Sequence, residues 1–160
     1  LVTSLPDDLP PARMDPDRLG QALLNICLNA LDAMPGGGTL TLDCTVEKQH
    51  LVLSVTDTGQ GIAPGNLSHI FDPYFTTKGH GTGLGLATVH KIVEALGGEV
   101  YVQSRQATAD TPGRTTFFIR LPQAGKAAGH PADGPDRQAG GPAANRQKGE
   151  DQGEHQHSRG

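Results

Sequence analysis

The last large apolar residue of this 160-residue chain is Leu121. Residues 123–160 contain no Leu, Ile, Val, Met, Phe, Tyr, Trp or Cys and are rich in Gly, Pro, Ala, Gln and charged groups. Such a segment buries too little apolar surface to offset the entropy that is lost on ordering it. We therefore expect one folded domain over residues 1–122 and a disordered tail over residues 123–160.

The composition excludes several classes of function. The formal net charge of −4 argues against a nucleic-acid-binding face. Cys27 and Cys44 have no metal-binding or redox spacing, so we expect two reduced thiols. The sequence has no apolar run of about 20 residues and no signal peptide, which predicts a cytoplasmic domain without direct membrane contact. Because the chain starts with Leu1 rather than Met, we expect a piece of a longer protein, whose other parts could include a membrane anchor.

The apolar pattern of the first 122 residues predicts helices and pairs of strands. Asp15 followed by Pro16 is typical of a helix start, and Pro35 with the glycines after it ends that helix. The pattern further predicts strands over residues 39–46 and 50–57, a short helical turn near 66–71, a helix over 82–96 and a second strand pair over 99–105 and 115–122. These elements predict an α+β fold with helices on one face of a mixed β-sheet.

Polar residues share one face of the first predicted helix. They are Arg18, Gln21, Asn25, Asn29 and Asp32, which fall within an arc of roughly 80°. The apolar residues around them favour a polar pocket, although a stripe that simply faces water is the alternative. In a pocket, an Asn carbonyl oxygen is a fair ligand for Mg²⁺.

Asp57 stands at the end of a predicted strand and is followed by Gly59 and Gly61. Glycines there allow a sharp turn and the close approach of a ligand. Asp57 is therefore either a turn former that binds its own backbone or a carboxylate that accepts a hydrogen bond from a ligand's amine.

The segment GHGTGLG, residues 79–85, places alternating glycines directly before the second long predicted helix. Backbone N–H groups in such a segment can bind phosphate together with the helix N-terminus. The segment lacks the lysine and hydroxyl of a P-loop, and it does not open a βαβ unit as a dinucleotide-binding fingerprint does. By itself it is weak evidence, because flexible loops are often rich in glycine.

Four segments in a fixed order make the pattern specific: NICLNA, DTGQGI, FDPYF and GTGLGL. In this order they resemble the ATP-binding catalytic domain of sensor histidine kinases, in the superfamily shared with gyrase, Hsp90 and MutL. The resemblance covers about residues 14–122. It implies a two-layer α/β sandwich, with helices over a mixed sheet, and binding of ATP with Mg²⁺.

The resemblance also implies roles for individual residues. Asn29 would bind Mg²⁺, Asn25 would lie beside the phosphates, and Asp57 would receive the adenine amino group. Residues 63–80 would form a mobile lid over ATP. The implied ATP-binding set is Asn29, Asp57, Gly59, Gly61, Ile62, Phe71, Phe75, Lys78, Gly81, Thr82, Gly83, Leu84, Gly85 and Leu86, and the implied catalytic set is Asn25, Asn29 and Lys78.

One position distinguishes kinases from hydrolases in this superfamily. The hydrolases resembling gyrase and MutL carry a glutamate, one helical turn before the Mg²⁺-binding asparagine, as general base on water. Asn25 stands there in this chain and cannot take a proton. We therefore expect transfer of the γ-phosphoryl group to an acceptor supplied from elsewhere.

The family's acceptor is a histidine on a separate dimerisation element, usually followed by an acidic residue. His50, His69 and His90 lie inside the domain and are followed by Leu, Ile and Lys. The partners implied are thus a histidine-bearing dimerisation element and the receiver domain of a response regulator, and this chain alone should lack autokinase activity. The alternatives are a stand-alone serine kinase of the anti-sigma type and a degenerate nucleotide-binding regulator.

Overall fold

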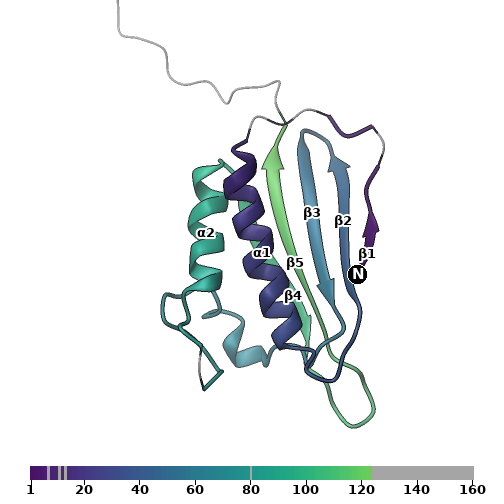
Figure 1. Cartoon of the computed structure of the whole chain (residues 1–160), viewed down its shortest axis with the longest axis vertical. Helices are drawn as coiled ribbons and strands as arrows, with labels where there is room; N and C mark the ends of the chain where they lie inside the picture. The colour runs from purple at the N-terminus through teal and green to yellow at the C-terminus, as the bar shows by residue number, and fades with distance from the viewer. Residues whose placement is uncertain (7, 11, 13, 80, 124–160) are drawn as a thin grey trace, which may run out of the picture. The chain divides into compact units, whose positions relative to one another are not determined.

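A computed structural model describes residues 1–123 of the chain, apart from residues 7, 11, 13 and 80. The described elements are, in order, β1 (Val2–Ser4), α1 (Pro16–Asp32), β2 (Leu40–Glu47), β3 (His50–Asp57), the short 3₁₀ helix η1 (Pro64–Asn66), α2 (Gly85–Ala95), β4 (Glu99–Arg105) and β5 (Arg114–Pro122). Figure 1 shows α1 and α2 in one layer and the sheet in the other. Apart from residue 123, the predicted disordered tail lies outside the described residues.

The five strands form one sheet in the order β1-β2-β3-β5-β4. β1 runs parallel to β2, and all the other neighbouring strands are antiparallel. The predicted mixed sheet and α+β class are therefore confirmed. The sequence did not predict β1, because its three residues are all exposed and pair with residues about 40 positions away.

Helix α1 begins as its sequence predicts but is buried on one face only. The Asp15 carboxylate accepts hydrogen bonds from the backbone N–H groups of Asp17 and Arg18, at 3.0 and 3.2 Å. The buried face consists of Ala22, Ile26 and Ala30. Not all the apolar residues around the polar stripe are buried, because Leu24, Leu28 and Leu31 are each at least 50% exposed.

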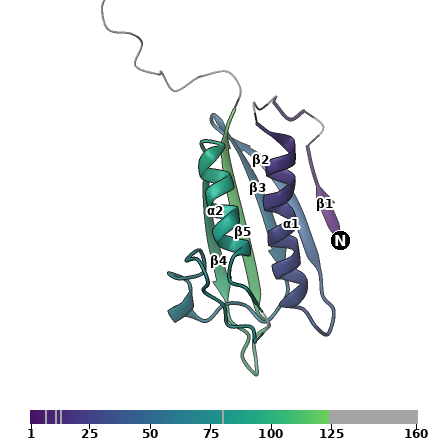
Figure 2. The ribbon, with the colours of Figure 1, turned by 60° about the vertical axis from the view of Figure 1, so that its left-hand side comes forward.

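The hydrophobic core lies between the two helices and the sheet face that they both cover, as Figure 2 shows from a second direction. The strand pattern decides which residues reach it. In β5, buried residues alternate with half-buried ones, and the buried set is Thr115, Phe117, Ile119 and Leu121. On the opposite face of the sheet the rings of Tyr101 and Phe118 stack, with centroids 4.7 Å apart.

Helix α2 begins at Gly85 rather than at Thr82, where the sequence predicted its start. Gly83 has a φ of +67°, which interrupts the helical path, and a Cβ there would collide with the backbone of Tyr74. The Gly83 carbonyl accepts a hydrogen bond of 3.0 Å from the Tyr74 N–H. The backbone before α2 is thus fastened to the preceding loop.

The short helical turn predicted near residues 66–71 is also displaced. The 3₁₀ helix η1 comes earlier, because Pro64 supplies the first helical position. Hydrogen-bonded turns continue from its end to Phe75.

Replacing Ile26 by alanine tests the packing of α1 on the sheet. The side chain is fully buried, so we expect a loss of about 2–5 kcal/mol in the free energy of unfolding. Leu24→Ala on the same helix is the matched control, because Leu24 is 58% exposed and its loss should cost about 0.5 kcal/mol or less. Urea unfolding of the two variants measures both values, and similar losses would contradict the one-sided burial of α1.

Gly83 and Gly85 provide a second matched pair. Gly83→Ala should destabilise the domain by about 1–3 kcal/mol, because its φ is positive and the Tyr74 backbone occupies the space of the new methyl group. At Gly85 a Cβ would meet only the Asn29 side-chain nitrogen, at 3.7 Å, so Gly85→Ala should be neutral or stabilise α2 by up to about 1 kcal/mol. Thermal unfolding distinguishes the two variants, and equal melting temperatures would show that position 83 does not require glycine.

Candidate functional site

A pocket of about 710 Å³ opens where α1, the end of β3 and the loop before α2 meet. Most of the residues predicted to bind ATP line it, and the described lining set includes Asn25, Asn29, Asp57, Gly61, Ile62, Phe75, Lys78, Gly81, Thr82, Gly83, Gly85 and Leu86. These residues are spread over about 60 positions of the chain. The fold therefore brings the predicted segments to one place.

Asp57 is the buried acidic group of the pocket. It ends β3, is 2% exposed and lies opposite Thr115 of β5. One of its carboxylate oxygens accepts a hydrogen bond of 2.8 Å from the Gly59 N–H. Burial raises the pKa of the Asp57 carboxyl above its ordinary value, and the Gly59 hydrogen bond opposes that rise. Asp57 thus both shapes its own turn and lines the pocket, so the two alternatives left open by the sequence are compatible.

The polar stripe of α1 is divided between the pocket and water. Asn25, Asn29 and Asp32 line the pocket. Arg18 and Gln21 are exposed and lie outside the lining set, so the pocket prediction is wrong for them. They sit one to two helical turns before Asn25, beyond the end of the pocket.

Lys78 reaches across from the loop to this face of α1. Its ammonium donates a hydrogen bond of 3.0 Å to the Asn29 side-chain oxygen, and it lies 2.7 Å from a carboxylate oxygen of Asp32. The sequence places Asp32 in the stripe, but it was not predicted to be a site residue. Its position three residues after Asn29 was the available signal, because such residues are neighbours on a helix surface.

The glycine-rich turn lies against the N-terminus of α2. Gly81, Thr82 and Gly83 line the pocket directly before the helix, and Gly85 and Leu86 continue the lining into its first turn. Among the residues that the structure describes, no side chain caps the first backbone N–H groups of α2. An uncapped helix N-terminus offers hydrogen-bond donors and a positive partial charge to an anion.

Three of the predicted binding residues do not line the pocket. Gly59 lies close to Ala33, and its N–H donates a hydrogen bond to the Asp57 carboxylate. The Phe71 ring packs against Phe117 in the core, with centroids 6.4 Å apart. Leu84, the residue directly before α2, is 41% exposed.

The structure adds lining residues that the sequence did not predict. They include Thr115 and Phe117 of β5 and Gln106 and Ala107 of the loop after β4, whereas Thr76 and Thr77 lie in the segment 63–80 that was predicted to form a lid. Thr115 and Phe117 reach the pocket because β5 pairs with β3 in the register Asp57↔Thr115. No local sequence signal indicates that register.

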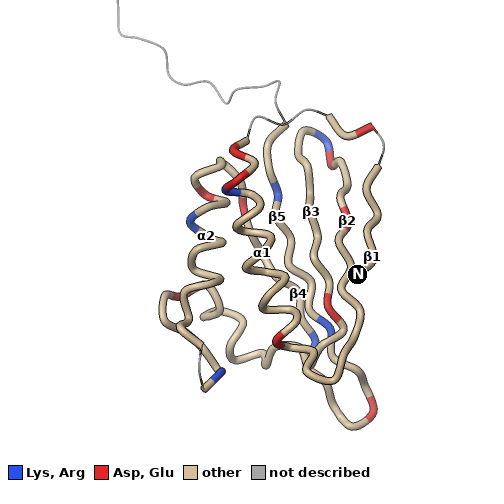
Figure 3. The backbone as a smooth tube through the Cα atoms, in the orientation of Figure 1, with Lys and Arg blue, Asp and Glu red and all other residues tan. Residues whose placement is uncertain are grey.

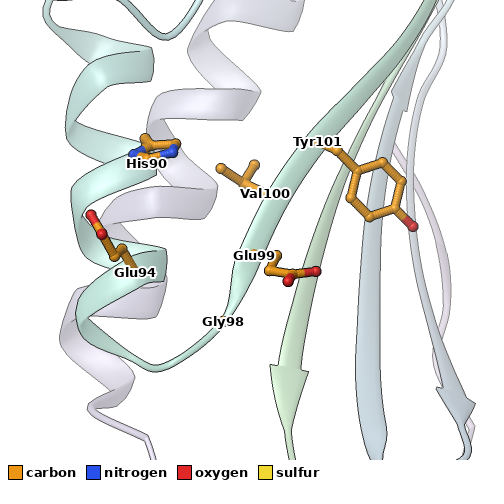
Figure 4. Close-up of a pocket in the computed structure, with 6 residues that line it drawn as sticks. All are labelled: His90, Glu94, Gly98, Glu99, Val100 and Tyr101. Atoms are coloured by element: carbon orange, nitrogen blue, oxygen red, sulfur yellow. The ribbon is translucent and has the colours of Figure 1, made fainter.

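A smaller hollow of about 400 Å³ lies between α2 and β4. His90 and Glu94 line it from the helix, and Glu99 and Tyr101 from the strand, as Figure 4 shows. None of the predicted binding residues lies there. The larger pocket is therefore the candidate site.

The described residues contain no group of three or more His, Cys, Asp or Glu that could hold a metal ion. Figure 3 shows acidic and basic residues interspersed along the described backbone. Within the same residues, no helix combines the length and apolarity needed to cross a membrane.

Comparisons with known proteins agree with this geometry. Residues 14–125 match the family described as histidine kinase-, DNA gyrase B-, and HSP90-like ATPase. The sensor histidine kinase ZraS of Escherichia coli (strain K12) is 49% identical over 116 residues, which cover 72% of this chain and 24% of ZraS. Sporulation kinase E of Bacillus subtilis is 37% identical over 117 residues, which cover 72% of this chain and 15% of that kinase. The chain thus spans about a quarter or less of the length of these relatives.

Solved structures show the same fold. Full-length ShkA, in a complex with AMPPNP, matches with a TM-score of 0.67 and 33% identity over 79% of this chain and 26% of ShkA. The nucleotide-free catalytic domain of the histidine kinase ThkA matches with a TM-score of 0.65 and 27% identity over 76% of this chain and 78% of that domain. The resemblance inferred from the four sequence segments is confirmed. The chain belongs to the family of histidine kinase-, DNA gyrase B- and HSP90-like ATPases.

Proposed function

We propose that the domain binds Mg-ATP and transfers its γ-phosphoryl group to a histidine on a dimerisation element outside this chain, as the catalytic part of a sensor histidine kinase. The observation that carries the proposal is the pocket itself. It has a buried carboxylate, Asp57, in one wall and the uncapped N-terminus of α2 in another. The carboxylate can accept a hydrogen bond from an amine, and the helix N-terminus can bind phosphates.

Asp57 is the residue proposed to select adenine. Its carboxylate is buried, so a hydrogen bond from the adenine amino group would form away from competing water. The Gly59 N–H holds one carboxylate oxygen and thereby fixes the orientation of the side chain. Apolar lining residues, among them Ile62 and Phe75, would contact the faces of the base.

The phosphates would lie between α1 and the start of α2. Backbone N–H groups of Gly81, Gly83 and Gly85 are proposed as donors, with Asn25 beside the phosphates. Lys78 is the only lysine or arginine among the described residues that line the pocket. Its ammonium would offset negative charge on the terminal phosphates.

Asn29 is proposed to hold the magnesium ion together with the ATP phosphates. The donor set fits, because a cation, the Lys78 ammonium, already lies 3.0 Å from the Asn29 side-chain oxygen. A magnesium ion usually takes few protein ligands when substrate phosphates supply the rest. When bound, the ion supplies charge neutralisation for phosphoryl transfer.

The pocket is poorly equipped to activate water. Asn25 carries an amide where hydrolases of this superfamily have a glutamate, and it cannot accept a proton. Asp32 is the one carboxylate of α1 in the described lining, and it is engaged with the Lys78 ammonium. These features favour transfer to a histidine over hydrolysis, with a response-regulator receiver domain as the later recipient and the cytoplasm as the place of reaction.

Calorimetric titration of the chain with Mg-ATP tests the proposal. Saturable heat followed by a flat baseline supports a kinase domain that lacks its acceptor. Continuous heat would reveal hydrolysis and would contradict the argument from Asn25. The absence of heat from a folded domain would favour a degenerate regulator.

Addition of a histidine-bearing dimerisation element from a related kinase should then give a phosphohistidine that is acid-labile and base-stable, whereas an acid-stable phosphoserine would indicate the serine-kinase alternative.

Asp57→Asn should weaken ATP binding by about 1–3 kcal/mol, because it removes the charged acceptor for the adenine amino group. GTP, which lacks that amino group, provides the contrasting ligand. Asp43→Asn is the control, since Asp43 lies on the outer face of the neighbouring strand β2. An unchanged ATP affinity in Asp57→Asn would contradict the adenine assignment.

The same variant should change the pH dependence of stability. The folded state raises the pKa of Asp57, so wild-type stability is lost as the pH rises from the ordinary value of 3.8 through the raised folded pKa. The amide that replaces the carboxyl group in Asp57→Asn has no such titration. The stability of Asp57→Asn relative to the wild type should therefore improve as the pH rises through that window, as measured by urea unfolding at several pH values. A stability difference between the two proteins that does not vary with pH would show that folding does not raise the pKa of the Asp57 carboxyl.

Asn29→Ala should reduce the gain in ATP affinity that magnesium produces, because it removes the proposed side-chain ligand. Binding measured with magnesium and with a chelator gives this gain directly. Gln21→Ala serves as the control, since Gln21 belongs to the same stripe but lies outside the pocket lining. If magnesium raises the affinity equally in Asn29→Ala and the wild type, another residue holds the metal.

A further inference from the structure

Lys78 occupies the place at Asn29 that the proposed function gives to the metal ion. Its ammonium lies 3.0 Å from the Asn29 side-chain oxygen and 2.7 Å from the Asp32 carboxylate. Two cations cannot share one amide oxygen at such distances without strong repulsion. Lys78 must therefore leave Asn29 when a metal ion binds there.

Asp32 explains why Lys78 rests at this point. Asn29 and Asp32 are three residues apart on α1, so their side chains are neighbours and form one acceptor pair. The loop also orients Lys78, because the Thr76 hydroxyl accepts a hydrogen bond of 3.1 Å from the backbone N–H of Lys78. Both Thr76 and Lys78 line the pocket.

We propose that Asp32 is a positioning residue for Lys78. It holds the lysine across the phosphate end of the nucleotide-free pocket and releases it to the phosphates when Mg-ATP takes its place. The inference rests on the proposed function for the identity of the ligand. The contact itself belongs to the nucleotide-free protein and can be tested without any ligand.

The ion pair between Lys78 and Asp32 is weak enough for Lys78 to exchange it for a contact with the phosphates. The side chains of Lys78 and Asp32 are 40% and 61% exposed, so water screens their attraction. A fully buried pair would resist separation, because each charge would be left without a partner. This pair holds the loop only weakly, and an incoming triphosphate with several negative charges can compete for the lysine.

Asp32 also places a negative charge beside the proposed phosphate site. In the absence of metal, that charge repels ATP and retains Lys78. Asp32→Asn removes both effects while keeping the size of the side chain. The variant should therefore bind metal-free ATP more tightly than the wild type does, whereas binding of Mg-ATP should change less.

The first test uses limited trypsin digestion of the complete, nucleotide-free chain. Trypsin must accept the extended Lys78 side chain, so the contact with Asp32 should protect the bond after Lys78. We expect Asp32→Asn to speed cleavage there by about two- to fivefold, the range for loss of a weak exposed ion pair. Cleavage after Lys48, in the turn between β2 and β3, is the internal reference. An unchanged ratio of the two rates would overturn the proposal.

The second test measures ATP affinity in the presence of a chelator and in the presence of magnesium. Asp32→Asn should tighten metal-free binding by about two- to fivefold. The gain should become smaller when Lys78→Ala is added, because the part that comes from release of Lys78 is then lost and only the removal of the Asp32 charge remains. Asp17→Asn, which removes the same charge from the exposed first turn of α1, should have no such effect.

The outcomes separate this proposal from the proposed function. If the wild type binds no ATP, the proposed function fails, and the digestion experiment still decides whether Asp32 holds Lys78. If the wild type binds ATP but Asp32→Asn changes neither the affinity for metal-free ATP nor the affinity for Mg-ATP, Asp32 has no positioning role. A gain that is equally large without Lys78 would likewise overturn the proposal, since it would reflect charge removal alone.

Discussion

The packing of α1 and α2 on a single face of the sheet is the constraint on which the rest of the structure depends. Ala22, Ile26 and Ala30 bring α1 close to the sheet, and the helix then presents its polar stripe at the edge of that contact. The apolar wall of the pocket is continuous with this core, because Ile70 and Phe117 belong to both. The position of the site is therefore fixed by the same contacts that stabilise the domain.

The sequence predicted those parts of the structure that have a local cause. The cap at Asp15, the alternation in β5 and the glycines before α2 each act within a few residues, and they gave the α+β class and most element boundaries. The order of the sheet depends instead on pairing between distant strands. For this reason β1 was missed, and neither Thr115 nor Phe117 was placed in the site.

The site residues show the same division. Asp57 and the Gly81–Gly85 region were predicted from short motifs, and they line the pocket apart from Leu84. Asp32 was seen in the stripe, but its partner Lys78 lies 46 residues later, and only the folded loop brings them together. The packing of the half-buried Phe71 ring against Phe117 likewise depends on a tertiary contact that its motif does not specify. The roles that the family resemblance gives to these residues remain predictions.

The hydrogen bond between Tyr74 and Gly83 joins the two ends of the loop that carries Lys78. Lys78 stands near the middle of that loop, so the number of residues on either side determines how far its ammonium extends. One inserted residue can lengthen a chain by about 3.3–3.6 Å, which is comparable to the distance from Lys78 to its acceptors. The length of the loop therefore determines where Lys78 meets α1, and relatives with a longer or shorter loop would need a different residue to reach the same point on α1.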